Sequence, residues 1–317
     1  MSTLLVASTG GHLKELHHLY RRLSGIEAPF RWVTFDSPQS RSLLDGEQVD
    51  FVPFVGGRDP LNVARNLAHA ARILRDDSVD TLVSTGSAVA LPFFGLGSAR
   101  RLGCHYIESA ARVDGPSLTG RLISTIPRVR LYTQHPGWAD RRWRCGGSVF
   151  DCFHTATAGC GQPRRLRSTV VVLGTYRGFG FRRLVRRLLE VIPAGTEVLW
   201  QTGDTDVTGL GVTGHDAIPE HQLSDAMRKA DVVVAHAGVG TALAALEVGK
   251  CPVLVPRRLC FREHVDDHQA QIASELGHRC LAIAAEADDL VLDDLLVAAT
   301  MSVTTVTEAP AFATSAS

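Results

Sequence analysis

Two short glycine-bearing turns carry the residues best suited to chemistry. Ser8-Thr9-Gly10-Gly11-His12 follows an apolar run, and His236-Ala237-Gly238-Val239-Gly240-Thr241 follows a run of valines. Glycines let backbone N–H groups and a helix N-terminus approach an anion closely, so both turns suit a diphosphate. An ordinary tight strand-to-helix connection also uses glycine, so these turns need support from their neighbours.

Two side chains beside these turns extend the chemistry. Glu247 lies six residues after Thr241, under two helical turns away, where a carboxylate can accept hydrogen bonds from both hydroxyls of a ribose. His12 stands where the carboxyl ends of parallel strands meet at a ligand crevice. An imidazole there can remove a proton from an acceptor hydroxyl. The simpler alternatives are an exposed glutamate and a helix-capping histidine.

A polar loop follows the apolar run 252–256 and supplies mixed hydrogen-bond donors and acceptors. Asp267, His268 and Gln269 are expected at the start of the next helix, where such groups suit sugar hydroxyls. His264 and His268 with Asp267 are also metal-ligand types. The loop lacks an HExxH-type core, so sugar recognition is preferred and no metal is predicted.

The elements that position these residues alternate between short apolar runs and helical periodicity. This pattern predicts an α/β protein with parallel sheets. In the first half, strands are expected near 4–8, 31–35, 50–53, 81–84, 105–107 and 130–132, with helices near 12–24, 61–75, 87–101 and 117–125. In the second half, strands are expected near 169–173, 197–201, 231–235, 252–256 and 280–283, with helices near 181–192, 221–230, 240–249, 266–277 and 287–299.

Length and composition favour two folded domains. The 317 residues suffice for two cores, and 45% hydrophobic with 21% charged residues is typical of folded proteins. We expect an acceptor-side domain over 1–158 and a donor-binding domain over 167–300. The small, polar and then basic residues 155–168 form the candidate linker, and 301–317 are expected to form a flexible tail.

Charge, cysteine spacing and hydropathy restrict the classes of protein to which this chain can belong. Lys and Arg outnumber Asp and Glu by 20 to 14 in residues 1–165 and are outnumbered 13 to 19 in 166–317, which gives no nucleic-acid footprint. The seven cysteines form no Cys-x-x-Cys pair, which indicates a reducing compartment. We see neither a leader peptide nor an apolar run near 18 residues, so a cytoplasmic protein is expected.

Together these motifs resemble the MurG-like GT-B glycosyltransferases, which build lipid-linked sugars from UDP-sugars. The second half looks like the donor-binding subunit of the eukaryotic two-subunit GlcNAc transferase of dolichol-linked oligosaccharide assembly, and the first half looks like its acceptor-side partner. Bacterial exopolysaccharide enzymes of the PssD and PssE type share both halves, here joined in one chain. The motifs that carry the resemblance are 172–175, 230–238, 245–252 and His264…Asp267-His268-Gln269 in the second half, and 8–12, 107–113 and 117–122 in the first.

The resemblance implies a GT-B fold, two Rossmann-like domains with a cleft between them. It also implies an inverting transfer, without metal or other cofactor, of GlcNAc, glucose or glucuronate from a UDP-sugar to a polyprenyl-diphosphate-linked acceptor. The implied donor-binding residues are Thr175, Ile218, His236, Gly238, Gly240, Thr241, Glu247, Asp267, His268 and Gln269. The implied acceptor-side residues are Gly10, Gly11, Glu108 and Arg112, with His12 as the catalytic residue.

Two departures from the family pattern matter. The eukaryotic acceptor-side relatives begin with a membrane-anchoring helix that we do not find here. Membrane contact is therefore expected to be peripheral, on the inner face, with the basic, Trp-containing stretch 127–143 as a candidate surface. The turn 174–181 is longer and more aromatic than the family's, which leaves its phosphate contacts open.

Three other functions remain open at this point. A natural-product glycosyltransferase of the same fold would act on a small aglycone, and a UDP-sugar 2-epimerase would need no acceptor. A nucleotide-sugar-binding partner subunit would not be an enzyme. The presence of both a donor half and an acceptor half argues against that last alternative.

Overall fold

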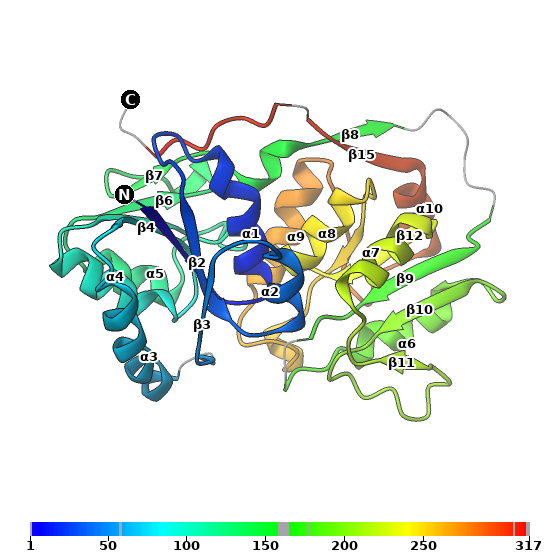
Figure 1. The fold of residues 1–317 in the computed structure, drawn as a ribbon. Coiled ribbons are helices and arrows are strands. Elements are labelled where there is room, and N and C mark those ends of the chain that lie inside the picture. Colours follow the sequence, from blue (N-terminus) through cyan, green and yellow to red (C-terminus); the bar gives the residue numbers. More distant parts are fainter. Residues whose placement is uncertain (1, 57–58, 158–164, 176–177, 307, 315–317) are drawn as a thin grey trace. The chain divides into compact units, whose positions relative to one another are not determined.

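The computed structural model describes residues 2–56, 59–157, 165–175, 178–306 and 308–314 in two compact units (Figure 1). The first unit comprises Met1–Asp151 with Ala309–Ser317, and the second comprises Cys152–Glu308. Each unit holds its own parallel sheet with helices packed on it, so the expected α/β class with two Rossmann-like domains is confirmed. The first segment of the first unit ends at Asp151, before the expected linker, and residues 158–164 of that linker lie outside the described residues.

The first unit is built on a seven-stranded parallel sheet in the order β3-β2-β1-β4-β5-β6-β7. Its strands are β1 (Ser2–Ala7), β2 (Phe30–Phe35), β3 (Val49–Val52), β4 (Val79–Gly86), β5 (Gly103–Ile107), β6 (Val129–Thr133) and β7 (Trp143–Cys145). The chain order reverses between β1 and β4. In open α/β sheets this switch point, at the carboxyl ends of the strands, is where ligands bind.

Five α-helices connect the described strands of the first unit. They are α1 (Gly11–Leu19), α2 (Pro38–Leu43), α3 (Pro60–Ile73), α4 (Ala90–Ala99) and α5 (Leu118–Ser124), with 3₁₀ turns at Tyr20–Arg22, Pro136–Trp138 and Val149–Cys152. Local capping starts α2 and α3, because the side chains of Ser37 and Asp59 accept from backbone N–H groups of the first turn and proline follows each. We did not predict α2.

The helix α4 packs closely on the sheet and is apolar on nearly all sides. A Cβ added at Gly97 would lie 2.3 Å from Cδ1 of Leu82 on β4, so glycine is required for this approach. Phe93 and Phe94 are fully buried in the core of the unit. α4 is therefore a helix of the core.

The second unit repeats the design with a six-stranded parallel sheet in the order β11-β10-β9-β12-β13-β14. Its strands are β9 (Ser168–Val172), β10 (Glu197–Gln201), β11 (Gly214–His215), β12 (Val232–His236), β13 (Val253–Val255) and β14 (Ile283–Ala284). Its helices are α6 (Arg182–Val191), α7 (Glu220–Lys229), α8 (Val239–Glu247), α9 (His268–His278) and α10 (Leu292–Thr300), with a 3₁₀ turn at Leu259–Phe261. The switch point lies between β9 and β12.

The C-terminal segment corrects our expectation of a flexible tail from residue 301. β15 (Met301–Thr305) pairs antiparallel with β8 (Phe153–Thr157) in the second unit. The chain then returns to the first unit, where Phe312 is fully buried against Gly146. The β-branched strand β15 and the buried Phe312 thus both have packing partners.

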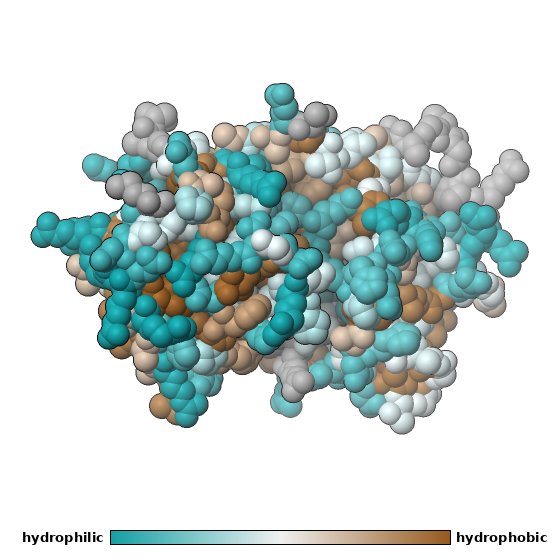
Figure 2. Space-filling view, viewed as in Figure 1, coloured by the Kyte–Doolittle hydropathy of each residue, from teal (hydrophilic) through white to brown (hydrophobic). Residues whose placement is uncertain are grey.

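The helices α3 and α5 of the first unit each carry two exposed leucines. Leu61 is 74% exposed and Leu118 is 61% exposed, and Leu67 and Leu122 are also exposed. Figure 2 shows apolar surface interspersed with hydrophilic side chains on the face that it presents. Within the described residues, no helix is both long enough and apolar enough to cross a membrane.

The tryptophans of 127–143 do not present an outward apolar surface. Trp143 is 5% exposed and belongs to the core of the first unit. Trp138 packs against the same core, and its Nε1 donates to the carbonyl of Arg112 at 3.0 Å. The aromatic part of this stretch is therefore used in packing.

Candidate active site

His12 lies at the switch point of the first unit, in the first turn of α1. Its Nδ1 lies 2.9 Å from the carbonyl oxygen of Thr85, at the end of β4, and the Thr85 hydroxyl donates to the carbonyl of His12 at 2.7 Å. A carbonyl only accepts, so Nδ1 carries a hydrogen, and the neutral form of this ring has its lone pair on Nε2. This is the tautomer that a general base needs at Nε2.

Glycines shape the backbone on both sides of His12. Gly86 has φ +117, and a Cβ there would lie 3.1 Å from Cε1 of His12, so the ring rests directly on the end of β4. Gly10 is exposed with φ +91, a conformation that favours glycine. The predicted glycine turn thus sits at the sheet edge, with Gly11 as the first residue of α1.

Gln39 is a residue of this turn that we did not predict. It lies on α2, and its Oε1 accepts from the backbone N–H of Gly10 at 2.6 Å. Its Nε2 also donates to the carbonyl of Gly10 at 3.3 Å. No motif marks Gln39, because only the fold brings α2 to the turn.

Glu108, predicted on the acceptor side, is a buried carboxylate with backbone partners. It is 1% exposed, and its carboxylate accepts from the backbone N–H groups of Ser109 at 3.1 Å and Ser117 at 2.9 Å. A Cβ at Gly120 would lie 2.1 Å from its Oε2. Glu108 therefore holds the loop between β5 and α5, which also carries the half-buried Arg112.

Glu15 is a second buried carboxyl, three residues after His12 on α1. It accepts from the Ser109 hydroxyl at 2.7 Å, the Ala110 N–H at 2.8 Å and Nε2 of Gln134 at 3.0 Å. These bonds tie α1 to the loops after β5 and β6. Burial is the main cause that raises the pKa of Glu15 to about 7.

This raised pKa predicts a pH-dependent stability. The folded protein binds the proton of Glu15 more tightly than the unfolded chain, whose glutamate pKa is 4.5. The free energy of unfolding should therefore fall as pH rises from about 4.5 to about 7, by up to about 3 kcal/mol from this group. Urea unfolding across this range should show a smaller fall in Glu15→Gln than in the wild type. The exposed Glu27→Gln is the control, and equal pH dependence in Glu15→Gln and wild type would refute the assignment.

His236 lies at the switch point of the second unit, at the end of β12. Its Nδ1 lies 3.2 Å from the carbonyl oxygen of Val172, at the end of β9. Burial, helped by the charge of Arg257, lowers the pKa of His236 to about 3. His236 is therefore neutral at physiological pH and adds no positive charge to the site.

Two glycines close on the His236 ring. A Cβ would lie 2.7 Å from Nε2 of His236 at Gly174, which has φ +81, and 2.4 Å at Gly238. Thr175, which follows Gly174, is exposed. The structure thus brings the predicted turns at 174 and 236 together around one imidazole.

The helix α8 begins in this turn and points its N-terminus at the carboxyl end of the sheet. Gly238 is its N-cap, and Gly240 and Thr241 lie half-buried in its first turn. An exposed Glu247 is its last residue, about 9 Å along the helix axis from Thr241. The helix dipole favours an anion beside Gly238.

Ile218, the residue predicted to lie against uracil, is half-buried after β11. Its backbone N–H donates to Oε1 of Gln201, at the end of β10, at 2.9 Å. This bond places Ile218 at the same carboxyl edge of the sheet as Gly174, on the far side of β9 from β12.

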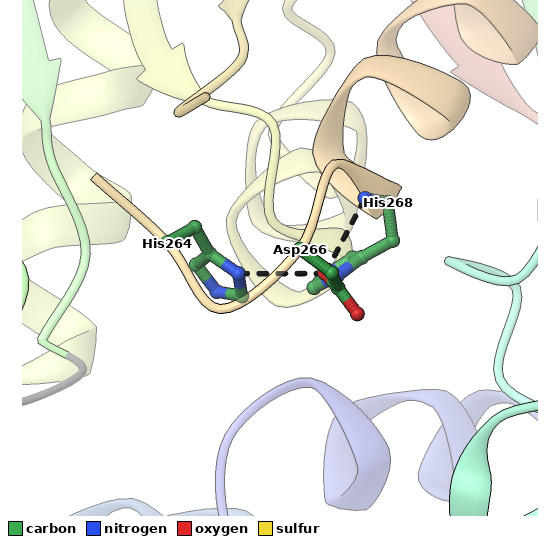
Figure 3. A group of neighbouring side chains, drawn as sticks. All are labelled: His264, Asp266 and His268. Carbon is green, nitrogen blue, oxygen red and sulfur yellow. Dashed lines mark hydrogen bonds and ion pairs between the residues drawn. The ribbon is translucent and has the colours of Figure 1, made fainter. Parts of the chain in front are cut away.

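The polar loop before α9 holds three residues with metal-ligand atoms within 4.8 Å of one another, namely His264, Asp266 and His268 (Figure 3). Asp266 is hydrogen-bonded to Nδ1 of His268 and lies 3.6 Å from Nδ1 of His264. Asp266 thus orients the imidazole of His268 by a hydrogen bond and lies beside that of His264. Asp267, the acid that we predicted beside these histidines, does not belong to this group. It is exposed and accepts from the backbone N–H of Leu259 at 3.0 Å.

Gln269, predicted to contact the sugar, is 3% exposed on α9. Its Oε1 accepts from the backbone N–H of Arg257 at 3.0 Å. Arg257 is itself buried at the carboxyl end of β13 and was absent from our prediction. The sequence did not mark Arg257, because it stands next to Arg258 in a polar loop and belongs to no motif.

Comparisons with known proteins find relatives among glycosyltransferases. Residues 169–311 match the glycosyltransferase family 28 C-terminal domain. One relative is the UDP-N-acetylglucosamine--N-acetylmuramyl-(pentapeptide) pyrophosphoryl-undecaprenol N-acetylglucosamine transferase of Parasynechococcus marenigrum. The two sequences are 25% identical over an alignment of 338 positions, which covers 93% of this chain and 87% of that protein. Over 82 residues the chain is 34% identical to the UDP-N-acetylglucosamine transferase subunit ALG13 of Yarrowia lipolytica, covering 26% of this chain and 39% of that protein.

Solved structures share the fold. MurG of Acinetobacter baumannii superposes with a TM-score of 0.55 at 17% identity, covering 94% of this chain and 89% of that chain. The calicheamicin glycosyltransferase CalG4 gives a TM-score of 0.54 at 17% identity, covering 94% and 90%.

The two doubly wound sheets and these structural neighbours define the class as a protein of the GT-B fold. The chain is a glycosyltransferase, and the match to the family 28 C-terminal domain falls almost wholly in its second unit. The similarity to the MurG-like enzymes, expected from the motifs, is confirmed. The likeness to the PssD and PssE type and the origin in two joined halves stay predictions.

Proposed function

We propose that this glycosyltransferase transfers a sugar from a UDP-sugar to a polyprenyl-diphosphate-linked acceptor, with inversion and without a metal. The observation that carries the proposal is the similarity along 93% of the chain to a transferase whose name states a UDP-sugar donor and an undecaprenol-linked acceptor. GlcNAc is the first sugar to test, with glucose and glucuronate as alternatives.

The chemistry assigns one step to each unit. His12 accepts the proton of the acceptor hydroxyl at Nε2, since its Nδ1 hydrogen is engaged by Thr85. The acceptor oxygen bonds to C1 of the sugar while the bond from C1 to the UDP oxygen breaks and its electrons leave with UDP. The N-terminus of α8 beside Gly238 stabilises the negative charge on the departing diphosphate.

The fold alone does not indicate which kind of acceptor is used, because the structures of CalG4 and MurG resemble this one almost equally well. The exposed leucines of α3 and α5 favour a lipid-linked acceptor over a small aglycone. Leu61 lies near Arg65 on α3, and Leu122 follows Arg121 on α5, so both helices combine apolar and basic side chains. This composition suits a peripheral contact with an anionic membrane surface.

The donor assignment is tested by UDP binding to Glu247→Ala. We expect the wild type to bind UDP in calorimetry and the variant to bind it about tenfold more weakly, because a carboxylate hydrogen bond to a ribose hydroxyl is worth about 1.5 kcal/mol or more. UDP and 2′-deoxy-UDP should bind Glu247→Ala with similar affinity, whereas the wild type should prefer UDP. Glu190→Ala removes another exposed carboxylate of this unit and should bind as the wild type does. An unchanged preference for UDP in Glu247→Ala would remove Glu247 from the ribose site.

A further inference from the structure

Arg257 is a buried cation without a neutralising partner in the described part of the chain. It is 1% exposed, and no carboxylate of the described residues lies within ion-pair distance of it. Its Nη2 donates to the carbonyl of Leu173, while its buried Nε has no hydrogen-bond partner. A buried charge left in this state is costly unless something else pairs with it.

The acids whose charge reaches Arg257 are already engaged by other groups. Glu263 is paired with Arg183 at 2.9 Å, and Asp204 accepts from the backbone N–H of Gly178 at 2.7 Å. Burial lowers the pKa of Arg257 to about 10, and these two acids only partly oppose that effect. Arg257 therefore keeps its positive charge at neutral pH.

Arg257 converges on the His236 turn from the neighbouring strand. The carbonyl that its Nη2 contacts belongs to Leu173, the residue before Gly174. A Cβ at Gly174 would meet the His236 ring, and the charge of Arg257 helps to lower the pKa of His236. The carboxyl ends of β9, β12 and β13 thus bring Gly174, His236 and Arg257 to one place.

We propose that Arg257 is the cation that binds the diphosphate of the nucleotide-sugar donor at the His236 turn. This assignment rests on the proposed function. The other groups at the turn leave most of the diphosphate charge unmet, because His236 is neutral and a helix N-terminus supplies only about half a positive charge. A guanidinium offers N–H groups in a fork that matches phosphate oxygens, and one of those of Arg257 is unused.

The proposal also gives Gln269 a positioning role. Its Oε1 holds the backbone N–H of Arg257, and Gln269 lies in the first turn of α9. The guanidinium is further packed beside the ring of Phe181, 5.9 Å from its centroid. The side chain is therefore held in one orientation before a ligand binds, which lowers the entropic cost of binding.

The alternative is that Arg257 only joins the ends of β9 and β13 through Leu173. Two variants separate charge from this structural bond. Both Arg257→Lys and Arg257→Gln keep an N–H donor for the Leu173 carbonyl, but only the lysine keeps the charge. Arg186→Gln, at an exposed position on α6, is the control for the net charge of the unit.

The experiment measures the affinities of UDP, UMP and uridine for all four proteins by calorimetry, after thermal unfolding has shown that each is folded. We expect Arg257→Gln to lose at least about tenfold in UDP affinity, with a smaller loss for UMP and no change for uridine. Arg257→Lys should keep its preference for UDP over uridine to within about tenfold of the wild type. If Arg257→Gln fails to fold, the proposal is judged on Arg257→Lys alone. Loss of the preference for UDP over uridine in Arg257→Lys would then overturn the proposal.

The remaining outcomes are distinguishable. Equal losses for uridine and UDP would assign Arg257 a structural role and overturn the proposal. An unchanged UDP affinity in Arg257→Gln would overturn it too, including the case in which the residue serves the diphosphate of the acceptor. A wild-type protein that binds no UDP would instead refute the proposed function itself.

Discussion

Replacing His12 with alanine is expected to lower turnover by about 10²–10⁴-fold, the usual contribution of a general base. The affinity for UDP should not change, because His12 belongs to the first unit and the predicted donor-binding residues belong to the second. The effect is expected to be large because the Thr85 carbonyl prepares Nε2 of His12 to accept a proton. The measurement is kcat with a UDP-sugar and a lipid-linked acceptor, together with the Kd for UDP.

His18→Ala is the matched control for His12→Ala, since it removes a half-buried histidine from the same helix. It should retain turnover close to that of the wild type. Turnover retained by His12→Ala would remove His12 as the base. A parallel loss of UDP affinity would instead place His12 in the donor site.

Replacing Gly238 with alanine is expected to weaken UDP binding by about a hundredfold. Its backbone has φ −92, which alanine accepts, so the whole effect comes from the added Cβ. That atom would lie 2.4 Å from Nε2 of His236, whose ring also contacts Gly174. Overpacking of this kind costs about 1–3 kcal/mol, and here the strain falls on the groups that surround the phosphates.

Gly277→Ala is the control for Gly238→Ala within the same unit. Its Cβ would meet Ala284 at 3.4 Å, an ordinary contact, so UDP affinity should match that of the wild type. Calorimetry with UDP distinguishes the two variants. Wild-type affinity in Gly238→Ala would show that the turn around His236 does not bind the diphosphate.

The sequence was informative wherever a residue's role depends on its own strand and turn. The valine run before His236 predicted β12, and its glycines predicted the turn into α8. The six-residue α2 was missed because hydrophobic periodicity needs a longer window, although Ser37 and Pro38 form a start signal.

Roles that depend on contacts between distant segments could not be predicted. Glu108 was predicted on the acceptor side from a motif, and only the fold shows that its carboxylate is buried and bonded to Ser117. Glu15, Gln39 and Arg257 carry no motif, and each acquires its role from another loop or helix. The tail from Met301 was judged by its polar composition, although alternate residues of a strand also suit pairing with a partner such as β8.

The most direct test of the central claim is transfer itself. The purified chain is incubated in EDTA with UDP-GlcNAc, UDP-glucose or UDP-glucuronate and a short polyprenyl-diphosphate-linked sugar, and the lipid product and UDP are measured by mass spectrometry. We predict that one donor adds a single sugar residue to the lipid and releases an equal amount of UDP. Consumption of a donor without a glycosylated lipid, or no consumption of any of the three, would contradict this account.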